Sequence, residues 1–150
     1  MAQLKLILLS WFGAGYSAKA PGTVGSAAAL PFAWVIATAW GSSGLLIAVL
    51  LVFILGWLAA HATSEAHKDP GWVVVDEVAG QWLTLAFIPP DLFLYGIGFI
   101  LFRLFDIFKP WPIRFLEQNI PGALAIMIDD IGASAYAGII LYTVFLIVGV

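Results

Sequence analysis

The 150-residue sequence contains no cysteine, and only 10% of its residues are charged. The absence of cysteine excludes disulfide bonds, thiolate metal sites and cysteine nucleophiles, while it leaves the redox compartment open. The net charge of −3 is small, and the chain has no basic patch of the kind that nucleic-acid binding needs. No charge run, low-complexity tract or polar linker divides the chain, so we expect residues 1–150 to form a single domain.

Apolar residues, in contrast, are abundant. They make up 63% of the chain, and the mean hydropathy is +1.04, whereas soluble domains are roughly 45–50% apolar. A water-soluble chain of this length could not bury so much apolar surface. We therefore expect an all-α, polytopic integral membrane protein. Its N-terminal segment has no small-residue cleavage site before Trp11, so we expect that segment to be retained.

Three stretches are long and apolar enough to span a bilayer as helices, which takes about 20 residues. They are 23–40, 45–62 and 131–150, and a short loop at 41–44 makes the first two a hairpin. The stretch 78–102 is interrupted by Pro89-Pro90-Asp91, because proline breaks helical hydrogen bonding. It is therefore either one broken span or two short helices.

The positions of the cations favour two short helices. Lysine and arginine occur at six positions, none of them in the turns 41–44 and 89–91: Lys5, Lys19, Lys68, Arg103, Lys109 and Arg114. The positive-inside rule places both cation-free turns outside and the cation-bearing segments in the cytoplasm. This placement requires an even number of crossings between residues 76 and 103. Two helices, at about 76–88 and 92–105, meet this requirement if they cross twice or form a re-entrant hairpin. We expect about five membrane segments with the N-terminus inside; the alternative, four spans, would separate the later charged clusters from the earlier ones.

A glycine-rich segment, residues 13–26, precedes the first long helix. Its glycines let backbone approach a ligand, and Thr23 or Ser26 can cap a helix whose N-terminal N–H groups favour an anion. With Lys19 beside them, these groups could cradle a phosphate. No Gly-Lys-Ser/Thr ending is present, so the segment is not a Walker A loop. An ordinary Gly/Pro loop entering a membrane helix explains the same residues.

Two acidic pairs are candidate metal ligands. Asp76 and Glu77 point about 100° apart if they are helical, so they need not serve one ligand, and as a solvated helix start they would suit the helix dipole. Asp129 and Asp130 directly precede the last long stretch, where two carboxylates repel unless cations, metal or a helix N-terminus compensate. Mg²⁺ takes such oxygen ligands together with substrate phosphate. The second pair is the sharpest functional signal in the chain.

A third charged cluster is spaced by threes. Arg103, Asp106 and Lys109 are predicted to lie along one helical face, a row that suits a phosphate and a divalent ion held together. An interfacial amphipathic helix with snorkelling cations is the alternative. His61 and Glu65, four residues apart, lack a zinc-protease signature and indicate a hydrogen-bonded pair at a helix end.

Taken in order, four motifs resemble the phosphatidylglycerophosphatase A family, membrane enzymes that convert phosphatidylglycerophosphate to phosphatidylglycerol in bacterial phospholipid synthesis. The similarity covers about residues 13–137. Ala18 and Ser134 depart from the family pattern, where proline and glycine are usual, but neither position is a candidate ligand. The motifs are Ala20-Pro21-Gly22-Thr23-Val24-Gly25-Ser26, Asp76-Glu77 with Gly80, Phe102-Arg103-Leu104-Phe105-Asp106 followed by Lys109-Pro110-Trp111-Pro112, and Ile126-Met127-Ile128-Asp129-Asp130.

The resemblance implies Mg²⁺-dependent phosphomonoester hydrolysis at the cytoplasmic face of the bacterial inner membrane, with phosphatidylglycerophosphate as substrate. The hypothesis assigns Mg²⁺ binding and catalysis to the acids Asp76, Glu77, Asp106, Asp129 and Asp130. It assigns phosphate binding to Lys19, Thr23, Arg103 and Lys109, with Arg114 a weaker candidate for glycerol or neighbouring lipid phosphates. A water activated by the metal is the preferred nucleophile, and attack by an aspartate is the competing route.

Two rival functions are weighed against this one. A small transporter or channel would also use intramembrane acids, but it predicts acids spread through the bilayer depth, whereas here they cluster at the ends of apolar runs. Another lipid phosphotransferase would hold Mg²⁺ with aspartates, but the nucleotide-alcohol transferases carry a longer Asp-x-x-Asp-Gly array, which Asp129-Asp130 lacks.

Overall fold

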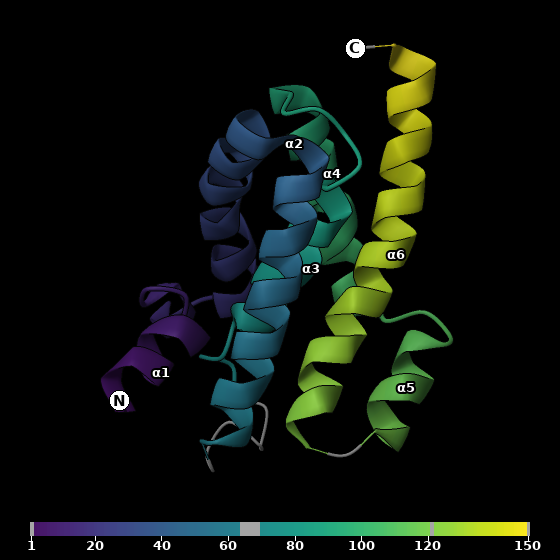
Figure 1. The fold of residues 1–150 in the computed structure, drawn as a ribbon. Coiled ribbons are helices and arrows are strands. Elements are labelled where there is room, and N and C mark those ends of the chain that lie inside the picture. The colour runs from purple at the N-terminus through teal and green to yellow at the C-terminus, as the bar shows by residue number, and fades with distance from the viewer. Residues whose placement is uncertain (1, 64–69, 121, 150) are drawn as a thin grey trace.

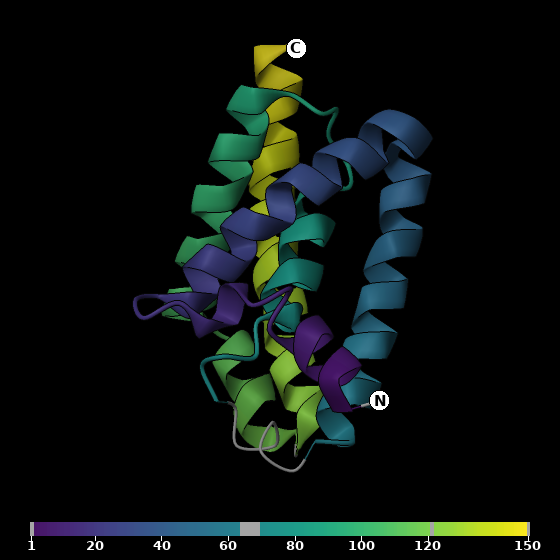
Figure 2. The same cartoon turned by 90° about the vertical axis from the view of Figure 1, so that its left-hand side faces the viewer.

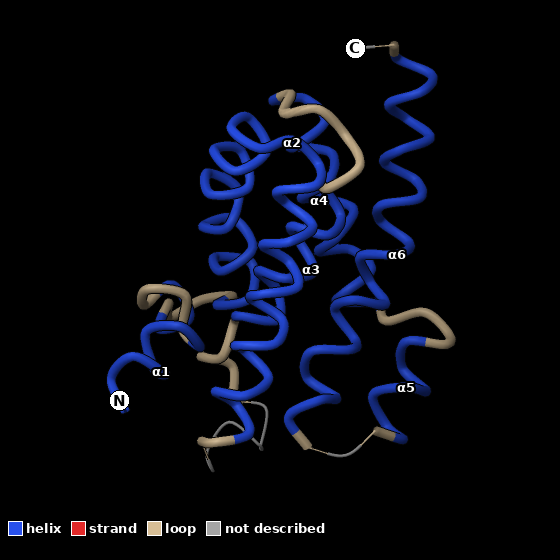
Figure 3. Tube along the Cα trace, in the orientation of Figure 1, coloured by secondary structure: helices blue, strands red, loops and turns tan. Residues whose placement is uncertain are grey.

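The computed structural model describes residues 2–63, 70–120 and 122–149, and these ranges contain helices and loops but no strand (Figure 3). The all-α prediction is therefore confirmed. Six α-helices and one short 3-10 helix follow in the order α1 (Ala2–Leu9), η1 (Ala14–Tyr16), α2 (Pro21–His61), α3 (Val75–Leu85), α4 (Leu92–Phe108), α5 (Ile113–Asn119) and α6 (Ala123–Val148).

Helix α2 is itself a hairpin. Its 41 residues continue through Pro31, but Gly41 has non-helical dihedrals (φ 64°, ψ −165°), which glycine adopts readily because it has no Cβ. The first arm runs to this glycine and the second arm turns back from it, and the two arms splay apart with distance from the turn (Figure 2). The predicted hairpin is confirmed, but the predicted four-residue loop is wrong. Gly41 alone makes the turn, and Gly44 leaves room for Trp40, whose Cβ lies 2.2 Å from where a Gly44 Cβ would be.

Helix α3 lies in the middle of the bundle, between α2 and α6 (Figure 2). It has only 11 residues, about 16 Å of helix, and nine of them are buried. The backbone N–H of Val74 donates to Leu9 O (2.8 Å) and so ties the start of α3 to α1. The Trp82 indole donates to Ala29 O of α2 (2.9 Å). These contacts fix the position of the residues at the α3 N-terminus.

Glycines allow α3, α4 and α6 to pack closely. A Cβ at Gly98 of α4 would lie 2.8 Å from Leu85 Cδ2 and 2.9 Å from Leu141 Cδ2, so the glycine lets these leucines pack directly on the α4 backbone, as is common between membrane helices. At the start of α4, Asp91 Oδ1 accepts a hydrogen bond from the Leu94 N–H (2.9 Å). The predicted helices at 76–88 and 92–105 are thus confirmed with small shifts of their ends.

Helix α6 begins at Ala123, eight residues before the predicted start at 131. Residues 123–128 read Ala-Leu-Ala-Ile-Met-Ile, an apolar run that continues the helix toward its N-terminus. The expectation that Asp129 and Asp130 directly precede the helix is therefore wrong. They lie in its second turn, where the helix N-terminus compensates their charge less than it would at the first turn.

The bundle has two distinct ends. The Gly41 turn of α2, the 86–91 connection and the C-terminus lie at one end, which we call the outer end; α1, α5 and the start of α6 lie at the other, which we call the inner end (Figure 1). Two described helices, α2 and α6, are long and apolar enough to cross a membrane. Large apolar side chains such as Val35 (63% exposed) and Ile139 (70% exposed) point outward from them.

Candidate active site

Helices α3, α4 and α6 bring five carboxylates together near the inner end. One oxygen from each of Asp76, Glu77 and Asp130 lies within 4.8 Å of the others, and the same holds for Asp106, Asp129 and Asp130. Asp130, only 2% exposed, belongs to both groups, so the acids form one continuous centre. The structure thus joins the acids of three separate sequence motifs.

Close backbone packing sets this arrangement. Asp76 and Glu77 occupy the first turn of α3, where the helix dipole stabilises negative charge. Gly80, one turn later, has no Cβ, and an added one would lie 2.9 Å from Asp130 O and 2.6 Å from Phe102 Cε2. The second turn of α6 therefore lies directly against α3. Within it, the Asp130 N–H donates to Asp129 Oδ1 (3.1 Å).

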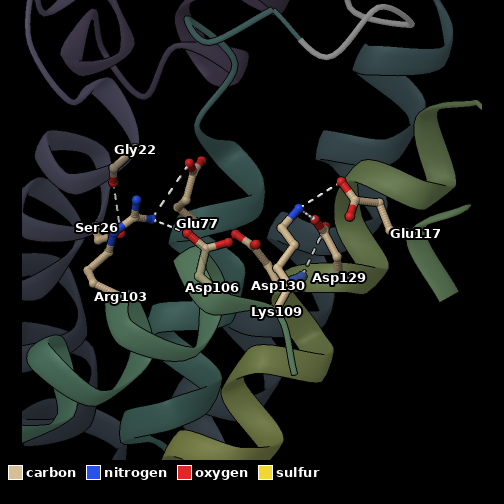
Figure 4. A network of polar contacts seen from close by, with 9 residues as sticks. All are labelled: Gly22, Ser26, Glu77, Arg103, Asp106, Lys109, Glu117, Asp129 and Asp130. Atoms are coloured by element: carbon tan, nitrogen blue, oxygen red, sulfur yellow. Dashed lines mark hydrogen bonds and ion pairs between the residues drawn. The ribbon is translucent and has the colours of Figure 1, made fainter. Parts of the chain in front are cut away.

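Arg103 flanks the acids on one side (Figure 4). Its guanidinium lies 2.5 Å from Asp106 Oδ2, one turn further along α4, and 3.8 Å from Glu77 Oε1. All three side chains are at most 15% exposed. Such a buried guanidinium between two carboxylates holds their positions, and its planar fork is suited to binding phosphate oxygens.

The glycine-rich segment meets the acids at Gly22, in the first turn of α2. A Cβ at Gly22 would lie 2.2 Å from Glu77 Oε1 and 3.0 Å from Arg103 Nη2. Ser26 Oγ donates to Gly22 O (2.8 Å) and occupies that carbonyl (Figure 4). The start of α2 therefore packs on the Arg103–Glu77 pair through a residue that offers only backbone.

Lys109 flanks the acids on the other side. It ends α4 with a left-handed backbone (φ 42°), and its ammonium donates to Asp129 and to Glu117 Oε1 (2.8 Å). Burial lowers the pKa of Lys109, but the hydrogen bonds and charges of Asp129 and Glu117 outweigh it and raise the pKa above the usual value. The predicted row of Arg103, Asp106 and Lys109 along one helical face is wrong, because α4 ends before Lys109.

Glu117, on α5, is the member of this network that sequence reasoning does not identify. It lies eight residues after Lys109, across the Pro110-Trp111-Pro112 turn, so no helical spacing links the two. Its side chain is 37% exposed, against 9% for Asp129. Glu117 thus lies at the rim of the site, and only its opposite charge could have suggested the pairing.

The other predicted phosphate-binding residues lie outside the ion-pair network of the described residues. Thr23 is half-buried beside Gly22, while Lys19, in the loop before α2, and Arg114, on α5, are both exposed. His61 is exposed at the end of α2. Glu65, its predicted partner, lies outside the described residues, as does Lys68.

The acids fit a hard divalent cation. Five carboxylates face two cations, Arg103 and Lys109, so three negative charges are in excess if all groups are ionised. Glu77 Oε2 and Asp130 Oδ2 are buried and have no hydrogen-bond partner among the described residues. Uncompensated buried carboxylates are costly, and Mg²⁺ prefers oxygen ligands of this kind.

The sequence profile described as "Phosphatidylglycerophosphatase A" matches residues 7–145, a segment that contains every acid of the site. The chain belongs to the phosphatidylglycerophosphatase A family. A phosphatidylglycerophosphatase A of Escherichia coli K12 is 39% identical over 139 residues, 91% of this chain and 80% of that protein. Its counterpart in Haemophilus influenzae is 36% identical over 141 residues, 92% of this chain and 86% of that protein.

A third relative has a different name. A protein of Bacteroides thetaiotaomicron that is provisionally named a phosphatidylinositol-3-phosphatase is 35% identical over 159 residues, 97% of this chain and 96% of that protein. No solved structure matches the chain. The resemblance to the phosphatidylglycerophosphatase A family is confirmed, and with it the prediction of an enzyme, a phosphoric monoester hydrolase.

Proposed function

We propose that this member of the family hydrolyses the terminal phosphomonoester of phosphatidylglycerophosphate to give phosphatidylglycerol and phosphate in phospholipid biosynthesis, in a reaction that depends on Mg²⁺. The observation that carries the proposal is the continuous acid centre around Asp130, flanked by Arg103 and Lys109. The names of the relatives from Escherichia coli and Haemophilus influenzae support the choice of substrate. A transporter role is not favoured, because the acids gather at one place instead of lining a path through the bundle.

In this proposal Mg²⁺ is held by oxygens of Asp76, Glu77, Asp106, Asp129 and Asp130. When bound, Mg²⁺ supplies Lewis-acid chemistry at the phosphate and offsets the excess negative charge of the acids. Without such an ion, a doubly charged phosphate monoester would be repelled from the centre. The acids therefore act first by creating a site that admits the phosphate only together with a cation.

The two flanking cations bind the phosphate oxygens in the proposed complex. Figure 4 shows Asp106 and Asp130 between Arg103 and Lys109, so the two cations can contact a phosphate from two sides and orient it for in-line attack. Charge-assisted bonds in a buried setting stabilise the negative charge of the transition state. Backbone N–H groups of the first turn of α2, around Thr23, add donors, and Lys19 and Arg114 contact the headgroup from the exposed side.

Water is our preferred nucleophile, with a site carboxylate accepting its proton. The alternative is attack by an aspartate, which would leave an acyl phosphate that water then hydrolyses. Treatment of the working enzyme with hydroxylamine distinguishes the two routes. An aspartyl hydroxamate would establish the covalent route, and its absence at full turnover supports direct attack by water.

We further propose that the protein is a multi-pass protein of the bacterial inner membrane, with five membrane segments and its acid site at the cytoplasmic face. The segments are the two arms of α2, the buried α3, α4 and α6. Two arguments support this. The cation-free turns at Gly41 and 86–91 share the outer end, and α5, which carries Arg114 and follows the turn that begins at Lys109, lies at the inner end (Figure 1). The positive-inside rule assigns the inner end to the cytoplasm.

The function is tested by phosphate release from purified protein in detergent. We expect the protein to release phosphate from phosphatidylglycerophosphate. The release should stop when a chelator is added and resume when excess Mg²⁺ is restored. Phosphatidylinositol 3-phosphate, suggested by the third relative, is assayed in parallel. No release from phosphatidylglycerophosphate would refute the proposed substrate, and chelator-insensitive release would refute the metal dependence.

The topology is tested with single cysteines, because the chain contains none of its own. Ser43 and Leu92 are exposed at the outer end, and Gln118 is exposed on α5 at the inner end. An impermeant thiol reagent applied from the periplasmic side should label Ser43→Cys and Leu92→Cys but leave Gln118→Cys intact. Labelling of Leu92→Cys and Ser43→Cys from opposite sides would contradict the two crossings by α3 and α4.

A further inference from the structure

A groove opens on the side of the bundle between α3 and α6. Its volume is about 590 Å³, within the roughly 300–1,000 Å³ that is usual for ligand pockets. Leu83 and Phe87, at the end of α3 and just beyond it, line one wall. Residues of α6 from Ser134 to Thr143 line the other, and Ser42, beside the turn of α2, contributes at the outer end. The exposed side chains of Phe87 (52%) and Ile139 (70%) place its opening on the lateral, lipid-facing side of the bundle.

The groove begins next to the acid site. Ser134 follows Asp130 by four residues, and residues four apart lie on the same face of a helix. From Ser134 to Thr143 the groove follows α6 for about 14 Å, at 1.5 Å per residue. It therefore starts one helical turn from the acids and leads away from them toward the outer end.

None of the described residues that line the groove is charged. Four hydroxyls lie in the lining, those of Ser42, Ser134, Tyr142 and Thr143, and the other lining side chains are apolar or absent. Ser134 and Thr143 donate to Ile131 O (2.7 Å) and Ile139 O (2.8 Å) of the same helix, so their protons are already used and they can only accept a hydrogen bond from a ligand. Burying polar groups in such a groove would cost free energy without compensation. A flexible apolar chain is the ligand chemistry that fits.

We propose that this groove holds an acyl chain of the phospholipid whose phosphate enters the acid site, an inference that rests on the proposed function. The lipid's phosphate lies at Asp130, its glycerol backbone passes Ser134, and one chain follows α6 between Leu83 and Ile139. An acyl chain inside a bilayer is already in apolar surroundings, so moving it into the groove adds little hydrophobic free energy to lipid binding. Its contribution is to orient the headgroup toward the acids and to favour long-chain lipids over water-soluble phosphomonoesters.

Two adjacent isoleucines provide a matched test. Ile139 lines the groove about 14 Å beyond Asp130 along α6, whereas Ile140 is 39% exposed and is not among the lining residues. In this cysteine-free chain, Ile139→Cys and Ile140→Cys can each be modified with a bulky thiol reagent after folding and purification. Each variant is assayed before and after modification, with long-chain and with dihexanoyl phosphatidylglycerophosphate, so that a folding defect would appear in the unmodified sample.

We expect modified Ile139→Cys to lose about tenfold or more in kcat/KM for the long-chain lipid and to change by less than about twofold for the dihexanoyl lipid, whose chains are too short to reach the label. Modified Ile140→Cys should retain both activities. An equal loss with both lipids, or no loss with the long-chain lipid, would overturn the groove assignment.

A second readout does not require turnover. Phosphatidylglycerophosphate with a photoreactive group at the end of one acyl chain should, on illumination with the wild-type protein, label Leu83, Phe87 and Ile139 in preference to the outward-facing Val35 of α2. Labels spread evenly over these positions would overturn the inference. If the wild-type protein is inactive on phosphatidylglycerophosphate but the groove is labelled, the proposed reaction fails while the lipid site stands.

Discussion

The acid site and the outer end of the bundle use carboxylates in different ways. At the outer end Asp91 has a local explanation, because its side chain caps the α4 N-terminus through the Leu94 N–H. The five acids of the site do not: they converge from three helices, repel one another, and outnumber the cations beside them. A carboxylate that stabilises its own helix is structural, whereas a cluster that destabilises the fold unless a cation binds indicates function.

The largest expected effect comes from exchanging one carboxylate for an amide in each region. Asp130→Asn should lower kcat/KM at least about a thousandfold, or about 4 kcal/mol, because Asp130 belongs to both acid groups. Without Mg²⁺, the thermal stability of Asp130→Asn should equal or exceed that of the wild-type protein, since a buried repelling charge is removed. Asp91→Asn should keep nearly full activity, because asparagine caps helices as well as aspartate does. Equal activity losses in the two variants would erase the distinction between the regions.

A smaller effect is expected from adding one methyl group at each end. Gly22→Ala would place a Cβ against the tips of the Glu77 and Arg103 side chains. Such tips can move, so the fold should survive while the site is displaced, and we expect kcat/KM to fall roughly 10- to 100-fold. Gly96→Ala, on α4, meets nothing within 4 Å and should raise stability by roughly 0.5–1 kcal/mol with activity unchanged. For each variant, thermal unfolding measures the stability and phosphate release measures the activity. Full activity in Gly22→Ala would argue against a role for the start of α2.

The smallest effects compare the core and the rim of the site. Lys109→Met leaves Asp129 without its cation, and we expect a loss of about tenfold in kcat/KM. Glu117→Gln removes a partner that is 37% exposed, and exposed ion pairs contribute only about 0–1 kcal/mol, so we expect less than about a threefold change. A larger effect for Glu117→Gln than for Lys109→Met would place Glu117 inside the catalytic centre.

Lys109 also has a definite pH behaviour. Its pKa is raised in the folded protein by Asp129 and Glu117, so its ion pairs contribute their full stabilisation below the unfolded-state pKa of lysine, about 10.4. That stabilisation is lost only as the pH rises through the higher folded-state value. Lys109 therefore stays charged across the neutral range, and a loss of activity between pH 5 and 9 would have to come from other groups.

Much of the fold is predictable from the sequence because its signals are local. The α2 hairpin follows from two uncharged runs around Gly41, and the α3–α4 pair follows from Pro89-Pro90 and the distribution of cations. The predicted start of α6 is too late because acidic residues in a sequence are expected to end an apolar segment. In the structure α6 begins at Ala123 and continues through both acids; Asp129 pairs with Lys109, while Asp130 Oδ2 has no hydrogen-bond partner among the described residues.

The candidate site is predictable only in part. The acids are recognisable individually, since buried carboxylates in an apolar chain need a reason. Their grouping depends on contacts that spacing does not encode, such as the close approach of α6 to Gly80. The pairing of Lys109 with Glu117 depends on the change of direction after α4. The groove along α6 involves Ser42 and Leu83, which no sequence pattern connects.

The central claim is that the five carboxylates form one divalent-cation centre, and direct metal binding tests it most directly. Mn²⁺ shares the oxygen preference of Mg²⁺ and is observable by electron paramagnetic resonance in the purified protein. We predict that the wild-type protein binds Mn²⁺, that Mg²⁺ displaces it, and that Asp130→Asn loses this binding while Asp91→Asn retains it. Binding that is absent from the wild-type protein, or unchanged in Asp130→Asn, would contradict the account.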